Sequence, residues 1–195
     1  MSQLATFCFE FGMLARTPRS GFHFLGSGGQ SVAEHTSRAL GIAFLLAKRS
    51  IEPVVELRLM QLVLFLDLPE ARTGDMNYVH QKYVRVSWDK LLDEMSSELP
   101  HGREIVAHVR EFENGETHEA LLAHDADQLE WLASLREEAD HGNPRAATWI
   151  PSVRARIRTP AGLQVAEELL NTASDAWWFH DKTDRHWVDR SGAEE

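Results

Sequence analysis

Three side chains that can bind a cation or carry a proton occupy positions where apolar residues would be expected. Asp67 directly follows the apolar run 62–66, and Asp127 shares a helical side with small and aromatic residues at i, i+4 and i+7 spacing. His35 likewise shares its helical face with apolar residues. A buried charge is costly unless it is neutralised, hydrogen-bonded, salt-bridged or bound to a metal. An imidazole and carboxylates that converge between helices suit a divalent transition metal.

Each of these residues also has a simpler interpretation. Asp67 can reach solvent from the end of its helix, or it can cap the turn that starts at Pro69. An inward histidine is most often hydrogen-bonded to a backbone carbonyl in a core. Three inward polar groups on three helices, each among apolar neighbours, nevertheless favour a shared site.

The elements that must position these groups are predicted to be helices. Apolar residues recur at helical spacing along most of the chain, and alternating β-branched runs between turns are scarce. Ser31 and Glu34 form a capping-box pattern that starts a helix at Val32 and places His35 in its first turn. The sequence therefore predicts an all-α domain. The predicted helices span 3–14, 32–49, 53–66, 78–99, 103–113, 116–139, 145–158 and 160–178.

Length and charge limit the classes of protein. The chain has 195 residues, and we expect a single domain over 1–179 followed by a polar tail over 180–195. A net charge of −10 argues against a nucleic-acid polymer or a membrane surface as partner. Cys8 is the only cysteine, no leader peptide is recognisable, and no apolar stretch approaches the roughly 18 residues that span a bilayer. We therefore expect a cytoplasmic protein.

Five short segments, taken in order, match the motifs of a known family. They are Leu14-Ala-Arg-Thr-Pro-Arg-Ser-Gly-Phe22, Ser31-Val-Ala-Glu-His35, Asp67-Leu-Pro-Glu-Ala-Arg-Thr-Gly-Asp75, Ala126-Asp-Gln-Leu-Glu130 and Asp175-Ala-Trp-Trp-Phe179. With these motifs the sequence resembles the HD-domain phosphohydrolases, and within them the small enzymes similar to 5'-deoxynucleotidases. The resemblance covers roughly 14–179 and implies an all-α HD-domain helical bundle.

The resemblance also implies a set of metal ligands. The family uses a histidine, a His-Asp pair and a distant aspartate, which correspond here to His35, Asp67 and Asp127. Asp127 is preferred to Asp125 because it carries the match and lies on the more apolar side of its helix. The histidine of the pair is replaced by Leu66, which has no lone pair to donate. The expected cofactor is one divalent metal ion, Mn, Co, Fe, Zn or Mg, at a site that Leu66 weakens or inactivates.

Leu66 has three competing explanations. It can be an inactivating laboratory substitution, a natural feature of an enzyme with a weaker site, or a mark of a non-catalytic relative. Glu70 and Asp75 are both present, which favours the first two. His80 and His124 are the other histidines considered as substitute ligands.

The chemistry that such a site supports is phosphate-ester hydrolysis. A metal ion lowers the pKa of bound water from 15.7 to about 7 in favourable sites and polarises a phosphoryl oxygen. By resemblance, Asp75 is the general acid or proton shuttle, and Glu70 orients water or substrate. Taken alone, Glu70 could instead pair with Arg72, and Asp75 could cap its turn.

An anionic substrate needs local cations in so acidic a protein. Arg16 and Arg19 match the family's substrate segment and can bind phosphate oxygens bidentately. Lys82 follows the catalytic turn and is a further candidate, with a solvated helix charge as its alternative. We expect an enzyme of the 5'-deoxynucleotidase or deoxynucleoside-triphosphate phosphohydrolase type, acting on (deoxy)nucleoside mono- or triphosphates and forming a homo-oligomer, most simply a dimer. The alternative is a non-catalytic HD module that binds a nucleotide or a partner.

Overall fold

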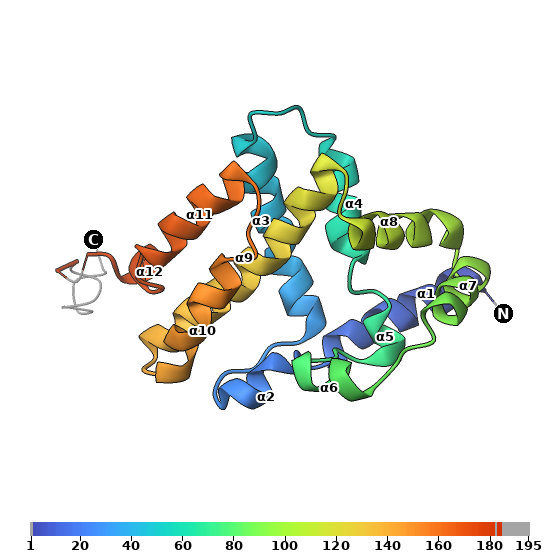
Figure 1. Ribbon diagram of the computed structural model, residues 1–195, viewed down its shortest axis with the longest axis horizontal. Helices are drawn as coiled ribbons and strands as arrows, with labels where there is room; N and C mark the ends of the chain where they lie inside the picture. Colours follow the sequence, from blue (N-terminus) through green and yellow to red (C-terminus); the bar gives the residue numbers. More distant parts are fainter. Residues whose placement is uncertain (1, 182, 185–195) are drawn as a thin grey trace, which may run out of the picture.

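The structure is a computed structural model that describes residues 2–181 and 183–184. Within these residues every regular element is a helix, apart from one isolated β-bridge between Pro18 and Ser31 (Figure 1). The prediction of an all-α fold is confirmed. Most of the polar tail predicted over 180–195 lies outside the described residues. Of the helices described, none is both long enough and apolar enough to cross a bilayer.

The helices follow the periodicity of the sequence, with additional short ones. The predicted bounds of 32–49 are those of α3. Its start at Val32 follows from the capping box, in which the Ser31 side chain accepts from the Glu34 backbone and the Glu34 side chain accepts from the Ser31 backbone. In chain order the elements are α1 (Gln3–Gly12), the 3-10 helix η1 (Met13–Arg16), α2 (Gly21–Leu25), α3 (Val32–Arg49), α4 (Glu56–Phe65), α5 (Glu70–Thr73), α6 (Tyr78–Tyr83), α7 (Trp88–Glu98), α8 (Gly102–Asn114), α9 (His118–Asp140), α10 (Pro144–Arg154), α11 (Pro160–Leu170) and α12 (Ala176–Phe179).

Two predicted helices were wrong because each is interrupted. The helix predicted over 78–99 stops at Tyr83, where β-branched Val84 has extended backbone, and a new helix begins at Trp88. The helix predicted over 160–178 ends at Leu170, where the backbone of the next residue, Asn171, leaves the helical region with φ −92° and ψ 2°. Asn171 Nδ2 donates to the carbonyl of Glu167, and the Thr172 hydroxyl donates to that of Glu168.

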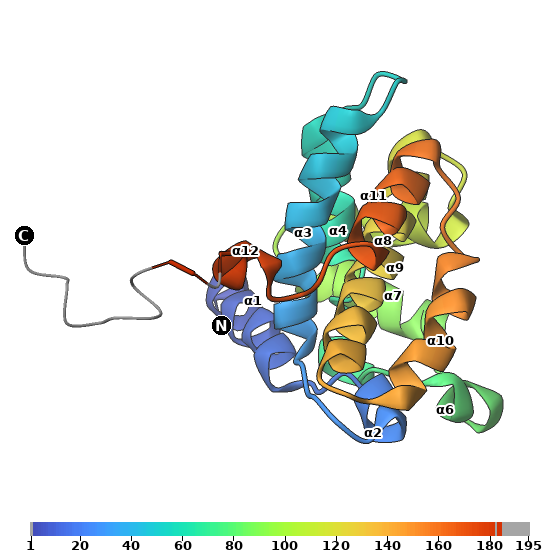
Figure 2. The ribbon, with the colours of Figure 1, turned by 90° about the vertical axis from the view of Figure 1, so that its left-hand side faces the viewer.

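The 23-residue helix α9 is the central element of the fold. It packs against α3, α4, α8, α10 and α11. Figure 2 shows α3, α9 and α10 as successive layers across the molecule. Helices α2 and α6 lie close together at one end in both views. One side of α9 is therefore buried against α3 and α4, and its other side supports α10 and α11.

Apolar side chains form two clusters, and the chain passes from one to the other at Asp67. The first cluster fills the space between α3, α4, α9, α10 and α11, and it includes Leu66. The second cluster lies among α1, α7 and α8, and it includes Leu68. Leu66 and Leu68 are 8% and 0% exposed. Asp67 is thus held between two buried leucines that belong to different clusters.

Candidate active site

Three predicted side chains from distant parts of the sequence meet at one point. His35 comes from the first turn of α3, Asp67 from the turn after α4, and Asp127 from the middle of α9. His35 Nε2 lies 3.1 Å from Asp127 Oδ1 and 3.4 Å from Asp67 Oδ2. The His35 side chain is fully buried, and those of Asp67 and Asp127 are 13% and 18% exposed. The helix packing thus brings together one imidazole and two carboxylates.

The facing atoms of this group suit a divalent cation. His35 Nε2 and Asp67 Oδ2 are buried and have no hydrogen-bond partner among the described residues. Two ligand atoms that each lie about 2.1 Å from one ion, at roughly 90–109°, are about 3.0–3.4 Å apart, which is the spacing observed here. The described part of the chain has no group of three or more His, Cys, Asp and Glu side chains already arranged around a metal position. The donor types and their spacing fit a cation, although the side chains are not preassembled around one.

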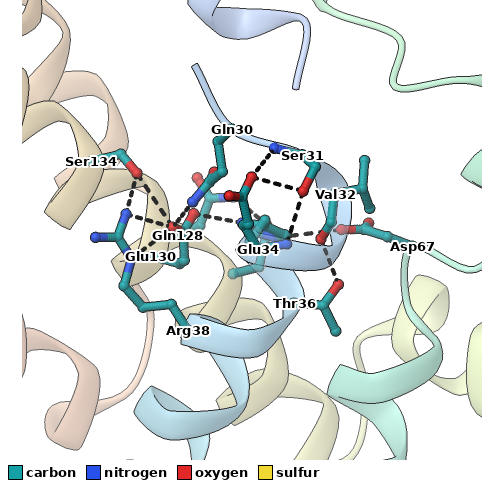
Figure 3. A network of polar contacts seen from close by, with 12 residues as sticks. Gln30, Ser31, Val32, Glu34, Thr36, Arg38, Asp67, Gln128, Glu130 and Ser134 are labelled. Atoms are coloured by element: carbon teal, nitrogen blue, oxygen red, sulfur yellow. Dashed lines mark hydrogen bonds and ion pairs between the residues drawn. The ribbon is translucent and has the colours of Figure 1, made fainter. Parts of the chain in front are cut away.

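Glu130 holds the opposite edge of the imidazole ring. His35 Nδ1–H donates to Glu130 Oε2 at 2.5 Å, which directs Nε2 towards the two aspartates. Glu130 is itself fully buried and accepts hydrogen bonds from Gln30 Nε2 at 2.6 Å and Arg38 Nε at 2.8 Å (Figure 3). A carboxylate behind a histidine is the usual support of a metal-binding imidazole. Glu130 was not among the residues predicted from the sequence, although it lies three residues after Asp127 on the same helical side.

The charges of the group depend on these contacts. Burial lowers the pKa of His35, but its contacts with Asp127 and Glu130 outweigh burial and raise the pKa to about 10. Burial acts in the opposite direction on the two carboxylates, yet their contacts with His35 lower the pKa of Asp127 and of Glu130 to about 2. The imidazole is therefore protonated while no cation is bound. A metal ion that binds Nε2 must displace that proton.

Glu70 and Asp75 lie beside the group, on and after α5. Burial, together with the charges of Asp67 and Asp75, raises the pKa of Glu70 to about 9, so its carboxyl group holds a proton at neutral pH. Burial also raises the pKa of Asp67, to about 6. Asp75 Oδ2 accepts a hydrogen bond from the backbone of Ser20 at 2.7 Å. Glu70 forms no ion pair with Arg72, whose guanidinium binds Glu10 at 2.6 Å instead.

A cavity of about 670 Å³ opens beside Asp75. Its walls come from the segment before α2, α2 itself, the segment between α5 and α6, and α6, α9, α10 and the segment after α10. Four aromatic side chains contribute to the walls, Phe24, Tyr78, Trp131 and Trp149. A concave space with aromatic walls and a few polar groups is typical of a small-molecule site.

The predicted substrate-binding cations are placed differently from one another. Arg19 lines the cavity. Burial lowers the pKa of Arg19, but the charges of the surrounding carboxylates, Asp127 and Asp67 foremost, raise it above its usual value. Lys82 is outside the lining and lies over the Tyr78 ring, with its Nζ 4.2 Å from the ring centre. Arg16 is exposed at the end of η1 and is not part of the cavity lining.

The alternative ligands considered from the sequence are engaged elsewhere or exposed. Asp125 is buried and accepts hydrogen bonds from the backbone of Arg158 and Thr159, each at 2.8 Å, at the start of α11. His124 Nε2 contacts the carbonyl oxygen of Phe112 at 2.7 Å. His80 is exposed on α6. Asp127 is accordingly the aspartate of α9 that faces His35.

The fold and this group define a class, an all-helical protein with a histidine and carboxylate centre between its helices. The model of the HD domain family matches residues 11–166, and the chain belongs to that family. No match was found among curated protein sequences.

Solved structures with the same fold come from archaea and bacteria. A conserved hypothetical protein from Pyrococcus furiosus is 22% identical, with a TM-score of 0.70, and the match covers 85% of this chain and 98% of that one. A protein from Pyrococcus horikoshii OT3 is 20% identical, with a TM-score of 0.69 and coverage of 86% and 96%. A predicted metal-dependent phosphohydrolase from Magnetospirillum magnetotacticum MS-1 is 23% identical, with a TM-score of 0.67 and coverage of 87% and 90%. At these identities the likeness establishes the fold.

Proposed function

We propose that this chain is a metal-dependent phosphohydrolase of nucleotides whose metal site is weakened by Leu66. The observation that carries the proposal is the convergence of three largely buried groups: both carboxylates approach His35 Nε2, Asp127 Oδ1 at 3.1 Å and Asp67 Oδ2 at 3.4 Å, while neither His35 Nε2 nor Asp67 Oδ2 forms a hydrogen bond with the described residues. Membership of the HD domain family and the name given to the Magnetospirillum protein support the same class.

His35, Asp67 and Asp127 would hold the divalent ion, for which Mn, Co, Fe, Zn and Mg are the candidates. When bound, such an ion lowers the pKa of water and polarises a phosphoryl oxygen. Glu130 keeps His35 oriented towards the ion through the bond at Nδ1. In the metal-free chain, burial and the neighbouring carboxylates raise the pKa of Glu70 to about 9, which makes it a candidate to give a proton to the oxygen that leaves phosphorus. We propose Glu70 as an alternative to Asp75, to which the resemblance assigns the acid role.

Asp75 and Arg19 then serve to position the substrate. Both residues line the cavity, and Asp75 is fixed by the backbone N–H of Ser20. The aromatic walls of the cavity offer stacking surfaces for a flat ring. An ester with a phosphate at one end and a flat ring at the other, such as a deoxynucleoside mono- or triphosphate, matches this combination.

Leu66 replaces the imidazole that would complete the ligand set in this proposal. It follows the last residue of α4, is 8% exposed, and packs into the first apolar cluster. A leucine at this position leaves one nitrogen and two carboxylates as protein ligands. Even losing a group that only supports a ligand commonly costs about 10–100-fold in metal affinity, and we expect the loss of a ligand to cost more.

The test compares this chain with the Leu66→His variant. Metal content is measured after loading with Mn²⁺, and phosphate release is measured on a panel of deoxynucleoside mono- and triphosphates. We expect the variant to bind metal more tightly and to release phosphate faster. Leu64→His, which makes the same chemical change at a half-buried position nearby, should gain neither property. His35→Gln added to Leu66→His should abolish the gain.

The alternative is a non-catalytic module that binds a nucleotide or a partner. Leu66 is the feature that favours it, because a missing ligand removes catalysis before it removes the cavity. Nucleotide binding without phosphate release, in both this chain and Leu66→His, would establish the alternative.

We also propose that the chain forms a homodimer. Trp177 on α12 is 85% exposed, and an exposed tryptophan of this kind is typical of an interface. Light scattering at several concentrations measures the mass in solution. Trp177→Ser should shift the distribution towards the monomer if α12 forms the interface.

A further inference from the structure

Arg156 is a cavity residue that the sequence analysis did not single out. It lies on the segment between α10 and α11 and lines the cavity. Its neighbour Arg154 is bound to Glu167, away from the cavity lining. In the part of the chain that the structure describes, Arg156 forms a hydrogen bond to an amide and no ion pair.

Gln128 connects Arg156 to the candidate metal centre. Arg156 Nη1 donates to Gln128 Oε1 at 3.4 Å, and Gln128 Nε2 donates to Asp127 Oδ2 at 2.6 Å. Since one amide group spans the two bonds, the guanidinium lies within ~8 Å of the Asp127 carboxylate. A phosphate bound between the guanidinium and a cation held at Asp127 would be within reach of both.

The two cavity arginines differ in their electrostatic surroundings. Arg19 faces four carboxyl-bearing residues, which raise its pKa and share its charge. Arg156 has no carboxylate within ion-pair distance among the described residues, although the chain carries a net charge of −10. An arginine fork binds two oxygens of a phosphate in parallel. The bond to Gln128 uses one of the five N–H groups of the Arg156 guanidinium, so the others can bind a charged ligand while Gln128 holds the side chain in place.

We propose that Arg156, placed by Gln128, binds the phosphate of the substrate and so sets the preference of the cavity for a phosphate ester over the parent alcohol. This inference rests on the proposed function, because it presumes a phosphate ester in the cavity. When the ligand arrives, the other N–H groups of Arg156 bind phosphate oxygens, while Nη1 keeps its bond to Gln128 Oε1 and Gln128 keeps its bond to Asp127. The Arg156 side chain contributes to substrate binding and specificity and takes no part in the proton transfers.

The test compares Arg156→Gln with Arg154→Gln, both prepared in this chain and in Leu66→His. Calorimetry in the presence of Mn²⁺ measures the Kd of the matching deoxynucleosides and of deoxynucleoside monophosphates, the latter as non-hydrolysable phosphonate analogues because Leu66→His is expected to cleave the natural esters. We expect Arg156→Gln to weaken monophosphate binding about 10- to 100-fold, as for a hydrogen bond to a charged group, and to leave nucleoside binding unchanged. Arg156→Lys should recover part of the loss. Arg154→Gln should bind like its parent, because that guanidinium is directed to Glu167.

The outcomes separate the two proposals. If the parent proteins bind the monophosphates and Arg156→Gln binds them equally well, the role of Arg156 is refuted and the proposed function stands. If neither this chain nor Leu66→His binds any phosphate ester, both proposals are refuted. An equal loss for the nucleoside and its monophosphate would show that Arg156 only shapes the cavity, which also refutes the inference.

A second measurement tests the placement by Gln128. Gln128→Leu removes the amide that holds Arg156, so we expect the double variant with Arg156→Gln to lose less than the two single losses combined. Strict additivity of the losses in monophosphate affinity would refute the coupling. The thermal midpoint of Arg156→Gln should match that of its parent, because the side chain is exposed.

Discussion

Replacing Glu130 with glutamine tests whether this buried carboxylate positions the imidazole of the site. Both carboxylate oxygens accept hydrogen bonds, Oε2 from His35 Nδ1 and Oε1 from Arg38 and Gln30. Glutamine keeps the shape but has one oxygen and one NH₂ group. In either orientation, the NH₂ group must therefore face a donor.

The magnitude of the effect follows from burial. Removing one partner of a buried ion pair costs about 3–5 kcal/mol, because a charge is left without compensation. Loss of the support behind a metal-binding histidine lowers metal affinity by about 10–100-fold. The matched control is Glu137→Gln, which removes a second carboxylate that binds the same Arg38 at 2.7 Å but is 44% exposed. An exposed pair contributes less than about 1 kcal/mol.

Urea unfolding and a Mn²⁺ competition assay measure the two effects, the latter in Leu66→His, where binding is expected to be stronger. We expect Glu130→Gln to lose both stability and metal affinity, and Glu137→Gln to lose little of either. If the two variants unfold with the same free energy and bind Mn²⁺ alike, Glu130 does not position His35.

Three further predictions concern packing, pH and capping. Gly162→Ala places a Cβ 2.3 Å from Asp125 Oδ2 and should cost about 1–3 kcal/mol in urea unfolding. Gly41→Ala, inside α3 where an added Cβ would meet no atom within 4 Å, should instead raise the free energy of unfolding by about 0.5–1 kcal/mol. Equal changes in the two variants would show that Gly162 is not closely packed against Asp125. The folded-state pKa of Glu70 is about 9 against an ordinary 4.5, so stability falls as pH rises through that range. Glu70→Gln cannot ionise and should not lose stability in this way. The difference in free energy of unfolding between Glu70→Gln and the unchanged chain, measured without metal, should therefore grow in favour of the variant as pH rises. A difference that does not change with pH would show that Glu70 is not protonated in the folded chain. Ser31→Ala removes the capping box of α3 and should lower the free energy of unfolding in urea by about 1 kcal/mol. An unchanged free energy would show that the cap does not stabilise the fold.

Local signals in the sequence predicted the features that depend on neighbouring residues. The start of α3 follows from the capping box at Ser31, and the inward direction of His35 follows from helical spacing. The breaks after Tyr83 and Leu170 escaped prediction, because the helical periodicity of the sequence continues through residues whose backbone leaves the helical conformation.

Features that depend on how helices cross were beyond the sequence. Glu130 could be placed on the same side as Asp127, yet its contact with His35 depends on the packing of α9 against α3. The cavity role of Arg156 depends on the position of the segment between α10 and α11 relative to Gln128. The family resemblance named the candidate ligands, whereas their spacing and supporting contacts are properties of the folded chain.

The position of Asp67 between Leu66 and Leu68 ties the reach of its carboxylate to the relative placement of two apolar clusters. A cation shared by Asp67, His35 and Asp127 would link the two apolar clusters at the point where the chain passes from one to the other. Loading the protein with metal should therefore make its thermal unfolding more cooperative and raise the midpoint temperature of the transition. The Leu66→His substitution exchanges a buried leucine for a polar ring, so the variant that adds a candidate ligand also weakens the packing of the first apolar cluster.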